Sequence, residues 1–317
     1  MDLNMNILYT LEKIRVPFFH LLFLGISYLG SEAVSVVVGV CIYWCVSKRK
    51  GLFVLTNCLI ASGINQTVKL LCHVPRPFVA NPDFSISDSA RATAGGFSFP
   101  SGHTQNSTSF YGSIAYLWKN RGVRIFCVVM IALVAFSRMY LGAHYPTDVL
   151  GGFVCGLVVL LLMIPVYKKS QSHPNLFPVV FGTGGVAMIV AILMFESGPW
   201  QGMASPEEMK EMLKGIGICA GCAVALAVGE PLERRFVRFE TEAVWWAQIL
   251  KTAVGFGLAA VLALIMKYPA VAIFGESRLA YAVRFFVPVL FAVCVWPMTF
   301  SWFSKLGNKH PVTKATR

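Results

Sequence analysis

Three short polar segments interrupt long apolar stretches of this chain, and each combines residue types that could bind an anionic group or move a proton. The first, KLLCHVPRP, holds Lys69 and Arg76, and Pro75 and Pro77 stiffen the turn around Arg76. Two cations at the end of a membrane helix can equally be interfacial anchors whose charged ends reach water. By itself, this segment leaves both interpretations open.

The second segment, PSGH at residues 100–103, has the pattern of a helix start that faces a ligand. Ser101 is a favourable N-cap, and Gly102 permits a close approach of the backbone. The free N–H groups and the dipole at a helix N-terminus bind anions, and His103 would lie over such an anion as a proton donor. A simple N-cap followed by an interfacial histidine is the alternative.

The third segment, SRMYLGAHYPTD, places Ser137 and Arg138 at the end of one apolar stretch and His144 four residues before Asp148. If a helix begins near Pro146, this spacing puts the carboxylate one turn from the imidazole and on the same face. A carboxylate there can hold one imidazole nitrogen and leave the other free as a nucleophile. The alternative is a surface pair without catalytic function.

The elements that must position these segments are membrane helices. Of 317 residues, 56% are hydrophobic and only 13% are charged, whereas a soluble domain carries about 25% charged residues. A soluble helical core would need polar helix faces, which most of the apolar stretches lack. The expected fold is therefore an all-α, polytopic membrane helix bundle. Its nine expected spans are residues 28–47, 52–72, 103–119, 124–142, 147–167, 176–196, 212–229, 249–267 and 281–303.

Three regions are expected along the chain. Residues 1–27 should form an amphipathic interfacial segment, because they hold charged residues and no small-residue cleavage site. Residues 28–170 carry all three polar segments and should form the core. Residues 171–317 hold plainer spans that complete the bundle, and two roles stay open for them: widening an entry for a lipid, or forming a homodimer interface.

The net charge of +12 indicates an orientation in the membrane. With alternating spans, the whole excess falls on one side, which includes Lys48 and the C-terminal Lys309, Lys314 and Arg317. Positive loops lie in the cytoplasm, so we expect a cytoplasmic C-terminus and an extracytoplasmic site. The charge is thus an orientation signal, and no nucleic-acid partner is expected.

The nine cysteines indicate no disulfide framework, since most lie in apolar stretches. Cys219 and Cys222 have C-x-x-C spacing, but neither a second pair nor a nearby histidine accompanies them. Small residues that pack helix on helix explain them better than a metal or redox site. The three polar segments also lack a carboxylate cluster or a Cys/His set, so we expect no metal and no other cofactor.

Because the spans ending near residues 72 and 142 and the span beginning at residue 103 share one side, all three segments should converge there. In combination they resemble the type 2 phosphatidic acid phosphatase superfamily, whose signature is K-x6-R-P, P-S-G-H and S-R-x5-H-x3-D. Every fixed position of that signature is present, in order, and the resemblance covers roughly residues 50–165. It implies a core of six membrane helices, to which this chain would add about three.

The resemblance also implies a role for each residue. His144 would attack phosphorus and form a phosphohistidine, Asp148 would orient His144, and His103 would protonate the leaving oxygen and then activate water. The residues implied to hold the phosphoryl oxygens are Lys69, Arg76, Ser101, Gly102 and Arg138, with Ser137 in a supporting position. These fixed cations would replace a metal ion.

The implied substrates are lipid phosphate monoesters or polyprenyl diphosphates, hydrolysed at the outer surface of the cytoplasmic membrane. The number of spans also resembles the glucose-6-phosphatase branch, so a sugar-phosphate substrate is the alternative. The vanadate-dependent haloperoxidases share the anion cradle but are not polytopic membrane proteins. A transporter should carry charged pairs inside its later spans, and hardly any occur here.

Overall fold

The computed structural model describes residues 3–197, 206–275 and 277–306, and every regular element within these ranges is a helix. The expected all-α fold is thus confirmed. The first part holds α1 (Leu3–Lys13), α2 (Pro17–Leu29), α3 (Glu32–Cys45), α4 (Lys48–Cys72), α5 (Pro77–Ala80), α6 (Asp88–Arg91), α7 (Gly102–Leu117), α8 (Arg121–Tyr140) and α9 (Pro146–Lys169). The second part holds α10 (Leu176–Ser197), α11 (Pro206–Leu232), η1 (Glu233–Val237), α12 (Trp245–Ile265), α13 (Lys267–Phe274), α14 (Arg278–Leu290), η2 (Phe291–Val295), η3 (Trp296–Thr299) and α15 (Phe300–Lys305).

Within the described ranges, seven helical segments are long and apolar enough to cross a membrane, and α2 with α3 forms an eighth candidate that is bent by 47°. Nine spans were expected. The expected span at residues 28–47 corresponds to α3, the second helix of the bent pair, and the chain breaks where Ser31 caps α3. The expected span at 103–119 corresponds to α7, whose 16 residues are fewer than the roughly 20 that cross a bilayer.

Helix α7 lies inside the bundle, which explains how a polar helix persists there. Its side chains bond to neighbouring helices: Gln105 donates to the carbonyl of Ala61 at 2.8 Å, and Asn106 donates to that of Gly30 at 3.0 Å. On the α9 side, a Cβ atom at Gly156 would lie 2.6 Å from the backbone oxygen of Gln105. Close helix approach and internal hydrogen bonds thus hold α7 against α4 and α9.

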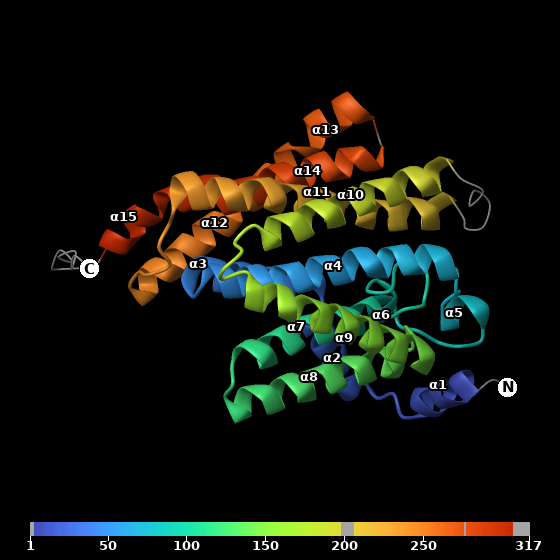
Figure 1. Ribbon diagram of the computed structural model, residues 1–317. Coiled ribbons are helices and arrows are strands. Elements are labelled where there is room, and N and C mark those ends of the chain that lie inside the picture. Colours follow the sequence, from blue (N-terminus) through green and yellow to red (C-terminus); the bar gives the residue numbers. More distant parts are fainter. Residues whose placement is uncertain (1–2, 198–205, 276, 307–317) are drawn as a thin grey trace.

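Helices α10, α11 and α14 lie on the side of α4 that is opposite to α7 and α9 (Figure 1). Helix α11 packs against α4, α10 and α14, and a large apolar cluster joins both sides of the bundle. Trp44, Phe53, Phe181 and Phe300 are among its fully buried members. Helices α3 and α4 therefore lie between the part of the chain that holds the polar segments and the C-terminal helices.

The residues before the first predicted span form two helices. Arg15, between α1 and α2, donates to the carbonyl oxygens of Tyr140 at 2.7 Å and Ser85 at 2.6 Å. These bonds join the N-terminal helices to the end of α8 and to the loop that follows α5. Helix α2 then packs along α8, which brings the buried Ser27 close to Arg138.

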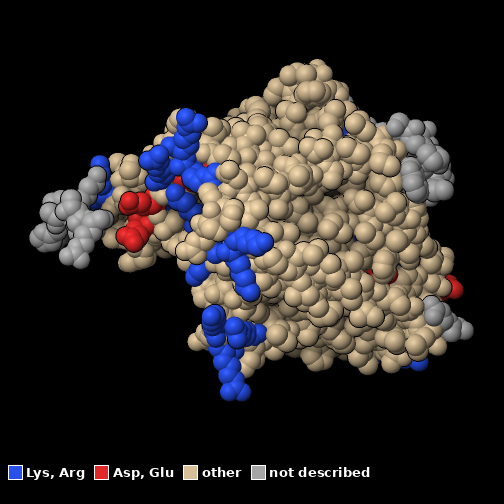
Figure 2. All heavy atoms as spheres, viewed as in Figure 1, with Lys and Arg blue, Asp and Glu red and all other residues tan. Residues whose placement is uncertain are grey.

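The two ends of the bundle differ in charge. Helices α1 and α5 lie at one end and α15 at the other (Figure 1). On the face drawn in Figure 2, Lys and Arg side chains gather toward the end that carries α15. There Lys48 forms an ion pair with Glu233 at 2.7 Å, and Arg49 donates to the carbonyl of Tyr167 at 2.8 Å. The predicted cytoplasmic cations Lys309, Lys314 and Arg317 lie outside the described residues.

Candidate active site

Arg76 stands at the centre of the site, anchored by backbone oxygens. Helix α4 carries Lys69 in its last turn and ends at Cys72. His73 then takes a left-handed conformation with φ 51° before the two prolines. The guanidinium of Arg76 then donates to the carbonyls of Gly96 at 2.7 Å and Ala143 at 2.9 Å, and also to that of Gly95. A buried cation is thus fixed between two loops that are far apart in the sequence.

The PSGH segment starts α7 as predicted from its residue types. The hydroxyl of Ser101 accepts a hydrogen bond from the backbone N–H of Thr104 at 3.5 Å. Ahead of it, Asn65 of α4 donates to the carbonyl of Pro100 at 3.1 Å, and the Ser101 N–H donates to the carbonyl of Asp148 at 2.9 Å. A Cβ atom at Gly102 would lie 3.2 Å from the Asn65 side chain, so little space exists there for a larger residue.

A glycine turn delivers His144 to the same place. Gly142, with φ 77°, ends α8 in a Schellman motif: its N–H donates to Met139 O, and the Ala143 N–H donates to Arg138 O. A residue with a side chain would be strained at this φ. Helix α9 begins two residues after His144, at Pro146, so the turn directs His144 toward Arg76.

His144 is held between a carboxylate and a cation. Its Nδ1 lies 3.5 Å from Oδ2 of Asp148, and its Nε2 lies 3.2 Å from a guanidinium nitrogen of Arg76. The carboxylate accepts hydrogen bonds from the Tyr145 N–H at 2.8 Å and from the Ser98 hydroxyl at 2.5 Å. This arrangement favours the tautomer with the proton on Nδ1, so the lone pair of Nε2 faces Arg76 and accepts from its guanidinium.

Burial and the nearby cations, chiefly Arg76, lower the pKa of His144 well below its usual 6.5. A neutral imidazole can act as a nucleophile, whereas an imidazolium cannot. The electrostatics of the site therefore keep the His144 imidazole neutral at neutral pH.

One cavity of about 450 Å³ joins the three polar segments. The predicted site residues that line it are Lys69, Arg76, Gly102, His103 and His144. The buried predicted site residues that do not line this cavity are Ser101, Arg138 and Asp148. Helix α11 adds Glu211 and Lys214 to the wall, which brings the C-terminal half to the site.

Arg138 and Ser137 occupy different environments. The guanidinium of Arg138 donates to Ser27 Oγ at 2.6 Å and to Thr93 Oγ1 at 3.0 Å. Its buried Nε has no hydrogen-bond partner among the described residues. Ser137 instead donates to the carbonyl of Val134 at 2.7 Å, within its own helix.

Sequence reasoning missed several residues that support the site. Ser98 bonds to the Asp148 carboxylate, Thr93 bonds to Arg138, and Asn65 bonds to both Pro100 and Gln105. Ser98 lies five residues before His103, which was a weak signal. Nothing in the sequence shows that Thr93 lies near Arg138, because the contact depends on how the long loop folds.

Comparisons with known proteins find similarity in both halves of the chain. Residues 50–172 match the model of the PAP2 superfamily, and residues 218–309 match that of the PAP2 superfamily phosphatase transmembrane extension. Phosphatidylglycerophosphatase B of Bacillus subtilis is 33% identical over 167 residues, which are 47% of this chain and 76% of that protein. No solved structure matches the chain.

Two further relatives match smaller shares of their own length. Undecaprenyl-diphosphatase BcrC of Bacillus subtilis is 38% identical over 96 residues, or 30% of this chain and 47% of that protein. Sphingosine-1-phosphate phosphatase 1 of the mouse is 24% identical over 229 residues, or 69% of this chain and 51% of that protein. Together with the apolar helices, these matches establish that this integral membrane protein belongs to the PAP2 superfamily of phosphatases.

Proposed function

We propose that this protein hydrolyses lipid phosphate monoesters or polyprenyl diphosphates through a phosphohistidine intermediate, without a metal ion. The observation that carries the proposal is the environment of His144: Nδ1 faces Asp148 at 3.5 Å, while Nε2 meets Arg76 at 3.2 Å in the cavity shared with Lys69 and His103. An oriented nucleophile, fixed cations and a second imidazole are the components that phosphoryl transfer requires.

In the first step, Nε2 of His144 attacks phosphorus, the N–P bond forms and the P–O bond to the leaving group breaks. His103 gives its proton to the leaving oxygen, so an alcohol or a lipid monophosphate departs. The equatorial phosphoryl oxygens gain charge and are stabilised by Lys69, Arg76 and the free N–H groups at the start of α7. Asp148 stabilises the positive charge that develops on the His144 ring.

In the second step, His103 accepts a proton from water, and the resulting hydroxide attacks phosphorus. The N–P bond breaks, its electron pair returns to Nε2 of His144, and inorganic phosphate leaves. Since the same group acts as acid in one step and as base in the other, each turnover restores the starting protonation of the site.

The orientation follows from the charge at the two ends of the bundle. Helix α4 is about 37 Å long from Lys48 to Cys72, so its basic start and the site at its far end face opposite membrane surfaces. The gathering of cations near α15 in Figure 2 supports a cytoplasmic location for that end. The site would then open on the extracytoplasmic side.

The names of the relatives favour a lipid over a soluble sugar phosphate. Phosphate release from phosphatidic acid, phosphatidylglycerophosphate, undecaprenyl diphosphate and glucose 6-phosphate by the detergent-purified protein compares the two substrate classes directly. We expect turnover of the lipids in the presence of EDTA and inhibition by vanadate, which imitates the trigonal transition state. A strict magnesium requirement would contradict the metal-free mechanism.

His144→Ala tests the nucleophile. We expect loss of turnover and of acid-labile phosphate bound to the protein after a rapid quench with labelled substrate. His173→Ala is the matched control, because His173 is an exposed histidine beyond the basic end of α9. If His144→Ala retains the turnover of the control, the nucleophile is another residue.

A further inference from the structure

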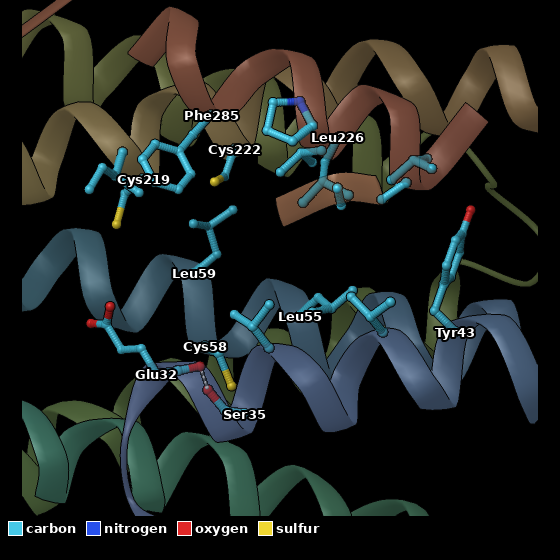
Figure 3. Close-up of a pocket in the computed structure, with 18 of the residues that line it drawn as sticks. Glu32, Ser35, Tyr43, Leu55, Cys58, Leu59, Cys219, Cys222, Leu226 and Phe285 are labelled. Atoms are coloured by element: carbon cyan, nitrogen blue, oxygen red, sulfur yellow. Dashed lines mark hydrogen bonds between the residues drawn. The ribbon is translucent and has the colours of Figure 1, made fainter. Parts of the chain in front are cut away.

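A second cavity lies beside the site, between α3 and α4 on one side and α11, α12 and α14 on the other. Its volume is about 290 Å³, and aliphatic, aromatic and cysteine side chains form most of its walls. In Figure 3, Leu59 points into it from α4, and Cys222 and Phe285 point into it from the opposite wall. Protein interiors are close-packed, so an apolar space of this size requires an occupant or costs stability.

The two cavities share a boundary. Glu32 at the start of α3 and Ile218 of α11 line both the apolar cavity and the cavity that holds His144. Polar groups of the apolar cavity gather near this boundary and bond to one another. Ser62 donates to the Glu32 carboxylate, and Ser35 donates to Asn106 at 3.2 Å. The remainder of the space offers few polar partners, which suits a hydrocarbon and not a headgroup.

The length of the cavity suits a hydrocarbon chain that lies along α3. Its lining extends along α3 from Glu32 to Trp44, which is roughly 18 Å at 1.5 Å per residue. This length is close to half of the ~30 Å hydrocarbon core, the depth that the tails of one leaflet occupy. Figure 3 shows Glu32 at one end of the space and Tyr43 toward the other.

We infer that this cavity holds the hydrocarbon chain of the substrate while its phosphoryl group lies against His144. The inference rests on the proposed function and adds the C-terminal helices to substrate recognition. The carboxylate of Glu32 at the boundary repels the phosphate, which stays with Lys69 and Arg76, whereas the chain passes Ile218 into the apolar space. The enzyme thereby selects substrates by the length of a single slender chain, whether alkyl or prenyl.

Filling the cavity tests the inference. Leu59→Trp and Cys222→Trp add bulk from opposite walls, and Leu162→Trp is the matched control because Leu162 is 63% exposed on the outer face of α9. The substrates are short-chain and long-chain alkyl phosphates, with farnesyl phosphate to separate prenyl from alkyl chains. We expect the long-to-short ratio of kcat/KM to fall about tenfold in both cavity variants, as if about two methylene groups lost their burial.

Activity on the short-chain ester separates the proposed phosphatase function from the proposed binding of the chain in the cavity. If the unsubstituted protein hydrolyses no phosphate ester, the proposed function fails. If it is active and the ratio in Leu59→Trp and Cys222→Trp equals that in Leu162→Trp, the cavity does not hold the chain. A photoreactive alkyl phosphate bound to the unsubstituted protein gives an answer that does not depend on whether the tryptophan variants fold. Adducts on α3, α4, α11 or α14 within the cavity support the inference, and adducts confined to outward faces overturn it.

Discussion

Ser98→Ala removes a hydroxyl that the sequence did not mark as part of the site. Its Oγ donates to Oδ2 of Asp148 at 2.5 Å and lies 3.5 Å from Nδ1 of His144. After the substitution, the carboxylate keeps the Tyr145 N–H at 2.8 Å but loses one of its two strongest restraints. Ser98 is therefore a positioning residue that acts on His144 through Asp148.

The expected fall in kcat follows from the charge on the carboxylate that accepts the hydrogen bond. A hydrogen bond to a charged group contributes about 1.5 to 3 kcal/mol. If most of it is needed only while the His144 ring gains charge, kcat falls between about 10-fold and 100-fold, since each 1.36 kcal/mol is a factor of ten. KM should stay unchanged, because Ser98 is not among the residues that line the catalytic cavity.

Stopped-flow measurement of phosphate release and of the phosphoenzyme burst separates this role from general damage. The burst rate should fall with kcat, while the thermal midpoint stays near that of a control. Ser113→Ala is that control: Ser113 is also fully buried, but its hydroxyl bonds to the carbonyl of Ser109 in its own helix at 2.6 Å. Equal kcat in the two variants, or a faster Ser98→Ala, would refute the positioning role.

Three further predictions concern pH and packing. Because burial and cations lower the pKa of His144, the acid limb of kcat/KM should lie below pH 6.5; a pH–rate profile with that limb at or above 6.5 disagrees. The free energy of unfolding should also fall as the pH drops below about 6.5, since the unfolded chain then binds a proton that native His144 does not. Gly156→Ala should lower stability by about 1 to 3 kcal/mol, because its Cβ would lie 2.6 Å from Gln105 O. Gly257→Ala is the control: nothing lies within 4 Å of a Cβ atom there, so it should not lower the thermal midpoint. Equal midpoints in the Gly156→Ala and Gly257→Ala variants would contradict the packing argument.

The sequence predicted the membrane bundle and the three polar segments because both are local properties. A run of apolar residues crosses a bilayer whatever its neighbours are, and the Ser101 N-cap of α7 requires only the residues around it. The number of spans differs from the expected nine, because α7 is short and polar and is buried among other helices. Its environment is a tertiary property that hydropathy does not contain.

The amino-acid sequence by itself determined which residue types could transfer a phosphoryl group and which end of each helix carries them. Only the tertiary structure decided that Ser98 holds Asp148, that Thr93 meets Arg138, and that α11 closes one wall of the cavity. The physical reason is how far apart in the sequence the interacting residues lie. Helix caps, turns and apolar runs depend on neighbours within a few residues, whereas a hydrogen bond across 45 or 50 positions depends on the packing of the whole bundle.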